Sequence, residues 1–485
     1  MTSERETTDG PDDSRGRPGG ARESSVIMKF GGTSVKDAEA VARLVRIVAG
    51  EPRPRLVVVS ALAGVTDALL AAARLAEAGD GTGAREAVRA LHRRHEQMAA
   101  VARAAERRAA LLAATDALFD ELEAIVRALA VVGEVSPRSA DAIAAFGELA
   151  SSRIVASALE DAGIPARWID ARSVLVTDAR HGAAVPDRPA TDARLRSTVR
   201  PLLDEGLVPV TGGFVGTTPA GITTTLGRGG SDYSASLFGA GLGAGEIQIW
   251  TDVDGMLTAD PRMVSGPQVV PSLSFDEASE LAYFGAKVLH PSTILPAVAR
   301  GIPVRILNSH RPDGPGTLVS RSVKGGEGGP VAIACKRGLT RIDIASSRML
   351  MAYGFLRRVF EVFERHRTPV DVVTTSEVSV SVTIDDRRAL DAIVAELATF
   401  ADVSSEDGMA IVCAVGERLG TDPRLATRVL GALEGLPLAM VSQGGSRKNI
   451  TVVLRDADAP AAMERLHRRF FETAARTPRE ARATA

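Results

Sequence analysis

Two short glycine-bearing segments carry the residue types that phosphoryl chemistry requires. They are residues 29–34 (KFGGTS) and residues 227–232 (GRGGSD). In each segment, paired glycines let the backbone approach an anion closely, and a cationic side chain stands beside them. Either segment alone also fits a tight turn with a solvated cation. Together, in a chain that alternates strands and helices, they predict a phosphoryl-transfer site.

The two cations suit different tasks. Lys29 carries a compact charge that can neutralise a transferring phosphoryl group. Arg228 presents a planar fork that matches a carboxylate or a phosphate. Asp232 can either orient Lys29 or accept a hydrogen bond from a substrate ammonium. No Walker sequence occurs in the chain, so the phosphate would be held without that loop.

The elements around these segments predict an α/β fold. Residues 25–30 read as a short strand before the first segment, and the second segment follows a strand at 208–214 and opens a helix at 235–242. Further strands are expected at 55–60, 166–169, 207–210, 247–251 and 304–308, and helices at 37–48, 67–130 (two or three) and 139–162. Strands that alternate with helices predict a mainly parallel sheet flanked by helices.

A second architecture is expected after a glycine-rich stretch at 320–330. Shorter elements follow: strands at 331–335, 339–344, 369–374 and 377–383 with helices at 354–366 and 387–397, then a comparable series from 409 to 474. The pattern predicts two copies of a small α+β unit, of the kind that binds a small ligand or a second copy of itself.

Composition narrows the class of protein. The 485 residues are 45% hydrophobic with a formal net charge of −2, which gives no basic field for nucleic acid or an anionic membrane. Only Cys335 and Cys413 occur, so neither a disulfide framework nor a metal site is expected. Residues 1–24 read as a polar, disordered tail without the apolar core of a signal peptide. We expect a cytoplasmic protein.

Six motifs resemble those of the aspartokinase family and occur in its order. They are KFGGTSV (29–35), VVSALAGVTD (58–67), FGEL (146–149), TTLGRGGSDY (224–233), WTDVDGM (250–256) and FGAKVLHP (284–291). The resemblance implies the amino acid kinase fold followed by two ferredoxin-like ACT domains. It also implies transfer of the γ-phosphoryl group of MgATP to the β-carboxylate of L-aspartate, which gives 4-phospho-L-aspartate.

The resemblance assigns roles to individual residues. It implies that Lys29 and Asp232 are catalytic, and that aspartate is held by Ser60, Thr66, Glu148, Phe214, Arg228 and Ser231. It implies nucleotide contacts at Lys29, Gly31, Gly32, Thr33, Gly229, Gly230, Thr251, Asp252, Leu257, Arg262 and Lys287, with Mg²⁺ carried by the nucleotide. Many members have tyrosine where this chain has Leu257. A carboxylate nucleophile is already ionised at neutral pH, so no general base is needed.

The C-terminal repeat resembles the regulatory region of the lysine-inhibited branch. The implied effector residues are Met349, Gly354, Phe355, Leu356, Asp371, Thr375, Ser376 and Glu377. Since ACT domains commonly pair between chains, a homodimer or a dimer of dimers is expected. The implied domains are a tail (1–24), a catalytic domain (25–318), a linker with the first regulatory strand (319–335), ACT domains at 336–400 and 401–476, and a tail (477–485).

Two other functions stay open from the sequence. One is an amino acid kinase for a different substrate, such as glutamate. The other is a catalytically silent amino acid sensor that keeps the ACT domains for binding. The presence of Lys29, Arg228 and Asp232 together favours the kinase over the sensor.

Overall fold

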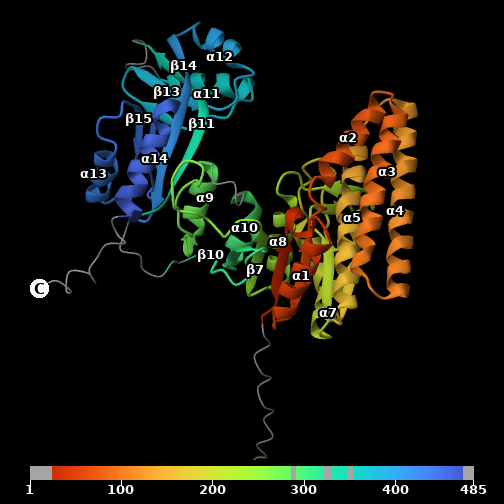
Figure 1. Cartoon of the computed structure of the whole chain (residues 1–485). Coiled ribbons are helices and arrows are strands. Elements are labelled where there is room, and N and C mark those ends of the chain that lie inside the picture. The colour runs from red at the N-terminus through yellow and green to blue at the C-terminus, as the bar shows by residue number, and fades with distance from the viewer. Residues whose placement is uncertain (1–23, 286–290, 322, 324–328, 347–352, 473–485) are drawn as a thin grey trace, which may run out of the picture.

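An eight-stranded sheet forms the N-terminal part of the computed structural model, which describes residues 24–285, 291–321, 323, 329–346 and 353–472 (Figure 1). Its strand order is β3-β4-β2-β1-β7-β9-β10-β8. The strands are β1 (Val26–Phe30), β2 (Arg55–Val59), β3 (Ala166–Ile169), β4 (Val208–Gly212), β7 (Glu246–Thr251), β8 (Ser272–Ser274), β9 (Val304–Asn308) and β10 (Thr317–Ser320). The six from β3 to β9 run parallel, and β10 pairs antiparallel with β9. The prediction of a mainly parallel sheet is confirmed.

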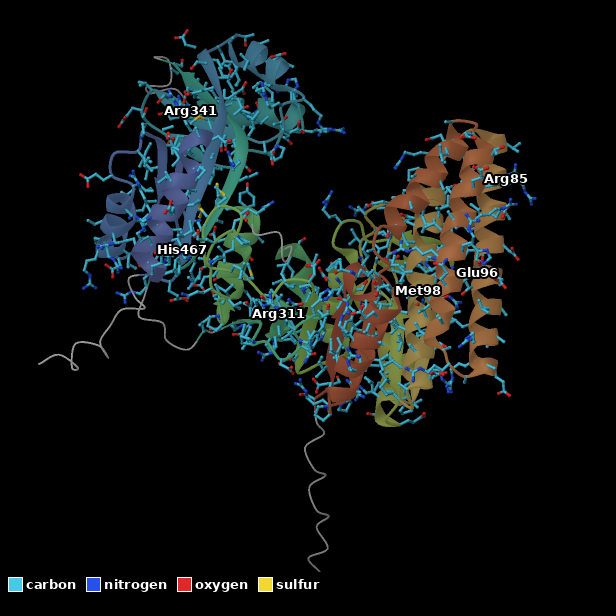
Figure 2. All side chains as sticks on the ribbon, viewed as in Figure 1. Arg85, Glu96, Met98, Arg311, Arg341 and His467 are labelled. Carbon is cyan, nitrogen blue, oxygen red and sulfur yellow. The ribbon has the colours of Figure 1, made fainter. Side chains whose placement is uncertain are left out.

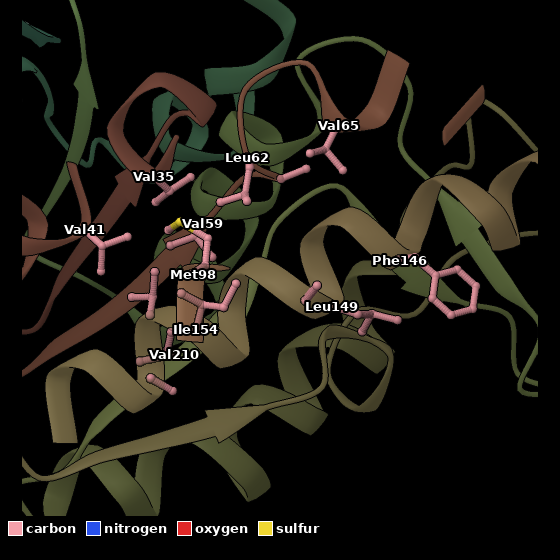
Figure 3. Close-up of a cluster of buried hydrophobic side chains, with 14 of the residues drawn as sticks. Val35, Val41, Val59, Leu62, Val65, Met98, Phe146, Leu149, Ile154 and Val210 are labelled. Carbon is pink, nitrogen blue, oxygen red and sulfur yellow. The ribbon is translucent and has the colours of Figure 1, made fainter. Parts of the chain in front are cut away.

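Helices cover both faces of this sheet. They are α1 (Ala38–Gly50), α2 (Val65–Glu77), α3 (Gly81–Met98), α4 (Ala105–Val132), α5 (Pro137–Asp161), α6 (Arg188–Arg194), α7 (Arg200–Asp204), α8 (Gly230–Leu242), α9 (Phe275–Tyr283) and α10 (Pro291–Arg300). Alternate residues of the central strand β1 enter different cores: Met28 and Phe30 pack on the side of α1 and α5, and Ile27 on the side of α8. Figure 3 shows part of the first core, where Val59 and Val210 of the sheet lie near Ile154 of α5, and Leu149 lies further along the same helix.

Helix α5 is a largely buried helix that borders the site. Among the described residues it is the one helix long and apolar enough to cross a membrane, but 89% of its most apolar window is buried inside the protein. Burial against the sheet explains its composition, so it reads as a core helix. It carries two acidic residues into this core, Asp141 and Glu148.

The second glycine segment sits differently from the prediction. A hairpin of β5 (Val215–Thr217) and β6 (Thr223–Thr225) intervenes between β4 and the segment, and β4 ends at Gly212 rather than at 214. Helix α8 begins at Gly230, not at 235, so Ser231 and Asp232 lie in its first turn. Polar residues at a helix start weaken the apolar periodicity on which the prediction relied.

The C-terminal part is one six-stranded antiparallel sheet, β12-β13-β11-β14-β16-β15. Its elements are β11 (Pro330–Ala345), α11 (Phe355–Arg365), β12 (Val373–Thr375), β13 (Ser379–Ile384), α12 (Leu390–Leu397), β14 (Asp402–Gly416), α13 (Pro423–Ala432), β15 (Leu438–Gln443), β16 (Asn449–Arg455) and α14 (Ala459–His467). Helices α11 and α12 pack on one half of the sheet and α13 and α14 on the other. The fold is therefore the expected α/β domain followed by an α+β region.

One prediction for this region was wrong. The strands expected at 331–335 and 339–344 form a single strand, β11, which pairs with β14 through a register shift between Lys336 and Leu339. Gly338 takes a φ of 74° in this irregularity, a conformation that favours glycine. Strands β11 and β14 each run through both halves of the sheet. Each half therefore contains a strand segment that belongs to the other repeat in sequence.

Candidate functional site

A cavity of about 670 Å³ opens where β1, β2, α5 and the start of α8 converge. Both glycine segments reach it. The sequence-predicted residues that line it are Lys29, Ser60, Thr66, Glu148, Phe214, Arg228, Gly229, Gly230, Ser231 and Asp232. The carboxyl ends of parallel strands meet at one edge of a sheet, which is why residues 203 positions apart share one site.

An ion pair between Lys29 and Asp232 lies in this cavity. Lys29 Nζ stands 2.6 Å from Asp232 Oδ1, and the two side chains are only 10% and 18% exposed. Lys29 belongs to the buried central strand, and Asp232 to the first turn of α8. The carboxylate fixes the direction of the ammonium. Of the two roles that the sequence left open for Asp232, the structure therefore contains the contact that orients Lys29.

Glu148 brings a buried carboxyl to the same cavity from the middle of α5. The residue is 3% exposed, and its Oε2 has no hydrogen-bond partner within the described part of the chain. Burial raises the pKa of Glu148 to about 8, against the lowering effect of a backbone hydrogen bond at Ala61 and of the charge on Lys29. A buried, unpartnered oxygen at a cavity wall is suited to receive a donor from a ligand.

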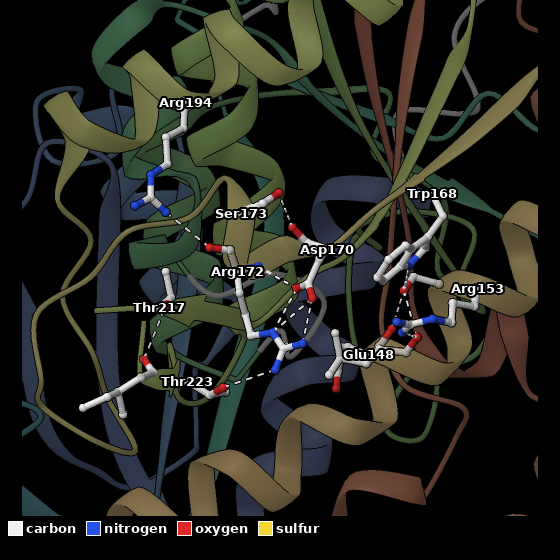
Figure 4. A network of polar contacts seen from close by, with 12 residues as sticks. Glu148, Arg153, Trp168, Asp170, Arg172, Ser173, Arg194, Thr217 and Thr223 are labelled. Atoms are coloured by element: carbon white, nitrogen blue, oxygen red, sulfur yellow. Dashed lines mark hydrogen bonds and ion pairs between the residues drawn. The ribbon is translucent and has the colours of Figure 1, made fainter. Parts of the chain in front are cut away.

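The turn of α5 that carries Glu148 is anchored on its far side. Figure 4 shows Trp168 Nε1 donating to Ser152 Oγ, at 2.9 Å, while Ser152 Oγ donates to the carbonyl of Glu148 at 2.7 Å. The guanidinium of Arg153 stacks over the ring of Trp168 at 3.7 Å. These contacts hold the backbone of the glutamate and leave its carboxyl free to face the cavity.

Glycines after β4 allow α5 and α8 to approach the sheet. A Cβ on Gly212 would lie 2.9 Å from Glu148 Cβ, and one on Gly213 would lie 2.7 Å from Ser231 Cα. Any larger residue would push apart the helices that carry the carboxyl and the ion pair. Phe214 follows with a φ of 63°, rare for a non-glycine residue, and its N–H donates to Ser234 Oγ at 2.9 Å. The tight geometry fixes this wall of the cavity.

Arg228 lies at the exposed rim of the cavity, in the loop between β6 and α8. Within the described ranges its guanidinium has no carboxylate partner, so its fork is available to a ligand. Gly227 and Gly229 flank it with φ values of 77° and 72°. These left-handed residues turn the loop so that α8 can begin immediately, with Asp232 facing Lys29.

The residues predicted for the nucleotide do not all lie in this cavity. The turn at Gly31 to Ser34 joins the end of β7 instead: Gly31 N–H donates to the carbonyl of Trp250, and Ser34 Oγ donates to Ser309 Oγ. Thr251 lies at that strand end, and Asp252 and Leu257 follow in the next loop. Arg262 is exposed and paired with Asp260 at 2.6 Å, and Lys287 lies outside the described residues.

Sequence reasoning missed Asp141 and Asp67, which also line the cavity. Asp141 stands seven residues before Glu148, two helical turns away on the same face of α5. This spacing was visible, but the sequence did not show which segments would cover that face. Thr225 and Gly182 complete the same wall.

The predicted effector residues gather around the N-terminus of α11 and the hairpin that follows it. Gly354 caps α11 with a φ of 82°, and Leu356 is exposed. Thr375 is the exposed last residue of β12, and Ser376 and Glu377 lie in the exposed turn that follows it. Met349 lies outside the described residues.

Asp371 is the predicted effector residue with the most contacts. Its side chain is 4% exposed, and Oδ1 lies 2.6 Å from Lys336 Nζ and accepts from the hydroxyl of Tyr283 at 3.3 Å. Its Oδ2 is buried without a partner in the described structure. Burial raises the pKa of Asp371, and the ion pair with Lys336 opposes that shift.

Helix α9 links the two parts of the chain. The carboxylate of Glu280 accepts from Ser446 Oγ and from Asn449 Nδ2, each at 2.7 Å, while Tyr283 contacts Asp371. At the base of the regulatory region, where Figure 2 labels it, His467 Nε2 lies 3.1 Å from Thr258 Oγ1 of the catalytic part. One hydrophobic core also runs across the boundary, from Phe275 and Leu281 to Ile411 and Val415.

Comparisons with known proteins agree with this arrangement. A model of the amino acid kinase family matches residues 24–308, and an ACT domain model matches residues 412–470. Lysine-sensitive aspartokinase 3 of Escherichia coli is 37% identical over 92% of this chain and 99% of its own length. Chloroplastic aspartokinase 3 of Arabidopsis thaliana is 38% identical over 93% of this chain and 82% of its own.

Solved structures give the same result. E. coli aspartokinase III in complex with lysine and aspartate, described as the T-state, superposes with a TM-score of 0.78 at 36% identity. The same enzyme with aspartate and ADP, described as the R-state, gives 0.77 at 37% identity. Each comparison covers 92% of this chain and 99% of the other. By these matches over nearly its whole described length, this chain belongs to the amino acid kinase family and, within it, to the aspartokinases.

Proposed function

We propose that this aspartokinase phosphorylates the β-carboxylate of L-aspartate in the cavity. The cationic and acidic side chains of the cavity are proposed to bind different parts of the two substrates. The observation that carries the proposal is the pairing of buried Lys29 with Asp232, opposite a buried, unpartnered carboxyl on Glu148. Two anions must meet in this reaction, so positioning and positive charge are what the site has to supply. Lys29 neutralises the transferring phosphoryl group, and Asp232 holds its ammonium in place.

The amino acid head group is assigned to the two free charges of the cavity. Arg228 takes the α-carboxylate with its unpaired fork, and Glu148 takes the α-ammonium. Ser60, Thr66, Phe214 and Ser231 complete the pocket. An incoming ammonium lowers the pKa of Glu148, so aspartate binding would release a proton below about pH 8, the value to which burial raises that pKa.

The nucleotide is proposed to lie beside the Gly31 to Ser34 turn and the ends of β7 and β9. The backbone of Gly31, Gly32, Thr33, Gly229 and Gly230 would lie against its phosphates, although the N–H groups of Gly31 and Gly230 already donate to the carbonyls of Trp250 and Gly227. The rest of the nucleotide would be contacted by Thr251, Asp252, Leu257, Arg262 and Lys287. Mg²⁺, when bound with the nucleotide, offsets phosphate charge. Two cavity carboxylates, Asp141 and Asp232, are already engaged by protein donors, so we assign Mg²⁺ no ligand from them.

Regulation is proposed to occur through lysine at the first half of the C-terminal sheet. Gly354, Phe355 and Leu356 would take the effector carboxylate at the start of α11, with Met349, Thr375, Ser376 and Glu377 around it. The buried Oδ2 of Asp371 would accept the effector ammonium. We divide the region into ACT domains at 336–400 and 401–476. Strands β11 and β14 each contribute a segment to both halves of the sheet.

A homodimer or a dimer of dimers through the ACT domains is also proposed. Exposed apolar side chains on this region support it, since Tyr353 is fully exposed and Leu356, Phe360 and Val378 are 41%, 38% and 46% exposed. Sedimentation with and without lysine is the measurement, and a monomer under both conditions would contradict it.

Replacing Lys29 by methionine should lower kcat by about 10² to 10³-fold, the usual cost of removing one preorganised charge from a transition state. The measurement is hydroxamate formation that depends on both aspartate and MgATP. Lys36→Met is the matched control, because Lys36 is 45% exposed and only loosely paired with Asp37, and it should retain full activity. Full activity of the Lys29 variant would contradict the mechanism.

Glu148→Gln should change how stability depends on pH. Folding raises the pKa of this carboxyl from 4.5 to about 8, so between these values the folded protein holds a proton that the unfolded chain has lost. The free energy of unfolding therefore falls as pH rises through this window, by up to about 1.4 kcal/mol per pH unit. Thermal unfolding of the ligand-free variant at several pH values should show a smaller loss.

The control for that measurement is Asp67→Asn, which removes an exposed carboxyl from the same cavity and should keep the dependence of the parent protein. If Glu148→Gln and the parent protein lose the same stability with rising pH, the Glu148 carboxyl is not protonated in the free enzyme.

Asp371→Asn should abolish inhibition by lysine and leave the activity without lysine within about twofold, because the neutral amide cannot pair with an ammonium. Inhibition curves with lysine in the hydroxamate assay measure this effect. Asp343→Asn is the control: Asp343 accepts from Ser381 Oγ at 2.6 Å in the same sheet and is assigned no effector contact. Unchanged lysine inhibition in the Asp371 variant would refute the assignment.

A further inference from the structure

Asp141 is the most fully bonded carboxylate in the wall of the cavity. It is 3% exposed and lies on α5, seven residues before Glu148. Oδ1 accepts from Thr225 Oγ1 at 2.5 Å, Oδ2 lies 2.8 Å from His181 Nδ1, and the N–H of Gly182 is shared between both oxygens at 3.0 and 3.1 Å. A carboxylate has about four acceptor positions, so these four contacts use its capacity. Asp141 therefore has little left to offer a substrate.

The three donors come from two segments that shape the arginine loop. Thr225 is the last residue of β6, three positions before Arg228. The segment of His181 and Gly182 lies against the same loop from outside, because a Cβ on Gly227 would stand only 2.9 Å from the carbonyl oxygen of Gly182. The N–H of Ala184 also donates to the carbonyl of Thr225 at 2.9 Å. One carboxylate thus ties α5, β6 and the covering segment together.

We propose that Asp141 is a positioning residue that sets the separation between Glu148 and Arg228, and that His181 tunes it from outside the cavity. The proposal rests on the roles given above to Glu148 and Arg228. Glu148 is fixed to Asp141 by two turns of one helix, and Arg228 is fixed to it through Thr225 and the Gly182–Gly227 contact. The distance between the Glu148 carboxyl and the Arg228 guanidinium then depends on the contacts of Asp141. That distance selects ligands with the ammonium and carboxylate of an α-amino acid.

His181 gives a test free of direct substrate contact. Its ring is 15% exposed, and the described residues lining the cavity include Gly182 but not His181. Since Asp141 accepts only, the ring must donate from Nδ1. Leucine at 181 removes this donor, whereas asparagine places an amide N–H near the position of Nδ1. Since the ring contacts Asp141 and does not line the cavity, we expect an effect of His181 on aspartate binding to act through Asp141.

His181→Leu should raise KM for aspartate about tenfold, as expected when a hydrogen bond to a buried charge is lost. We expect kcat and KM for ATP to stay within about twofold, and His181→Asn to recover most of the affinity. Protection of the protein from thermal unfolding by aspartate should weaken in parallel, which reports on binding without turnover. Unchanged KM for aspartate in His181→Leu would overturn the proposal.

Thr225→Val supplies a second arm, with Thr224→Val as its matched control. Both hydroxyls are buried in β6, but Thr224 bonds to Thr177 at 2.6 Å rather than to Asp141. We expect a higher KM for aspartate only in Thr225→Val, and a double variant with His181→Leu that loses less than the two single losses combined. An equal rise in the Thr224 control would mean a general structural effect and would refute the proposal.

Arg228→Ala separates this inference from the assignment on which it rests. If Arg228→Ala leaves KM for aspartate unchanged, the head-group assignment is wrong whatever the His181 variants do. If Arg228→Ala raises that KM and His181→Leu does not, the assignment stands and only the positioning role fails.

Discussion

The structure depends on holding an ammonium inside the protein at the end of the central strand. Lys29 sits between two parallel neighbours, β2 and β7, and its side chain is 10% exposed. A buried cation is costly unless a partner stands close, and Asp232 supplies that partner at 2.6 Å. The need for this pair explains why α8 must begin at Gly230 and why Gly213 must be small enough to let Ser231 approach. Much of the cavity follows from that single requirement.

Glu148 shows the opposite use of burial. Asp232 is paired, but Glu148 keeps one oxygen without a partner, and its raised pKa records the cost of ionising it there. Burial favours the neutral form of the Glu148 carboxyl in the free enzyme. A bound cation favours the ionised form, which is a stronger hydrogen-bond acceptor. Two acidic residues in one cavity thus have different surroundings, since Asp232 has a cationic partner in the protein and Oε2 of Glu148 has none in the described residues. The site therefore favours a ligand that can donate a hydrogen bond to the unpartnered Oε2 of Glu148.

The sequence predicted six of the eight strands of the N-terminal sheet and their order along the chain from local apolar runs, but it missed the short strands β8 and β10. Local patterns also predicted the glycine segments with Lys29, Arg228 and Asp232, whereas the other aspartate-binding residues came from the family resemblance. The strand at 166–169 and the glycine segments are visible in a few residues each. Asp141 was not visible, since a lone aspartate in an alanine-rich helix has meaning only beside Thr225 and Gly182, which lie 84 and 41 positions away. The strands expected at 331–335 and 339–344 were the opposite error, because one long antiparallel strand absorbs the left-handed Gly338 between them as a bulge.

The catalytic part and the C-terminal sheet are joined by a packed interface. One apolar core joins Phe275 and Leu281 of α9 to Ile411 and Val415 of β14, and polar contacts at Glu280 and Tyr283 fix the two ends of that helix turn. Packed interiors transmit displacement because they have few voids to absorb it. An effector ammonium on Oδ2 of Asp371 would share the carboxylate with Lys336 and with the hydroxyl of Tyr283, which both contact Oδ1. Such a ligand would therefore alter the surroundings of Tyr283, the last residue of α9.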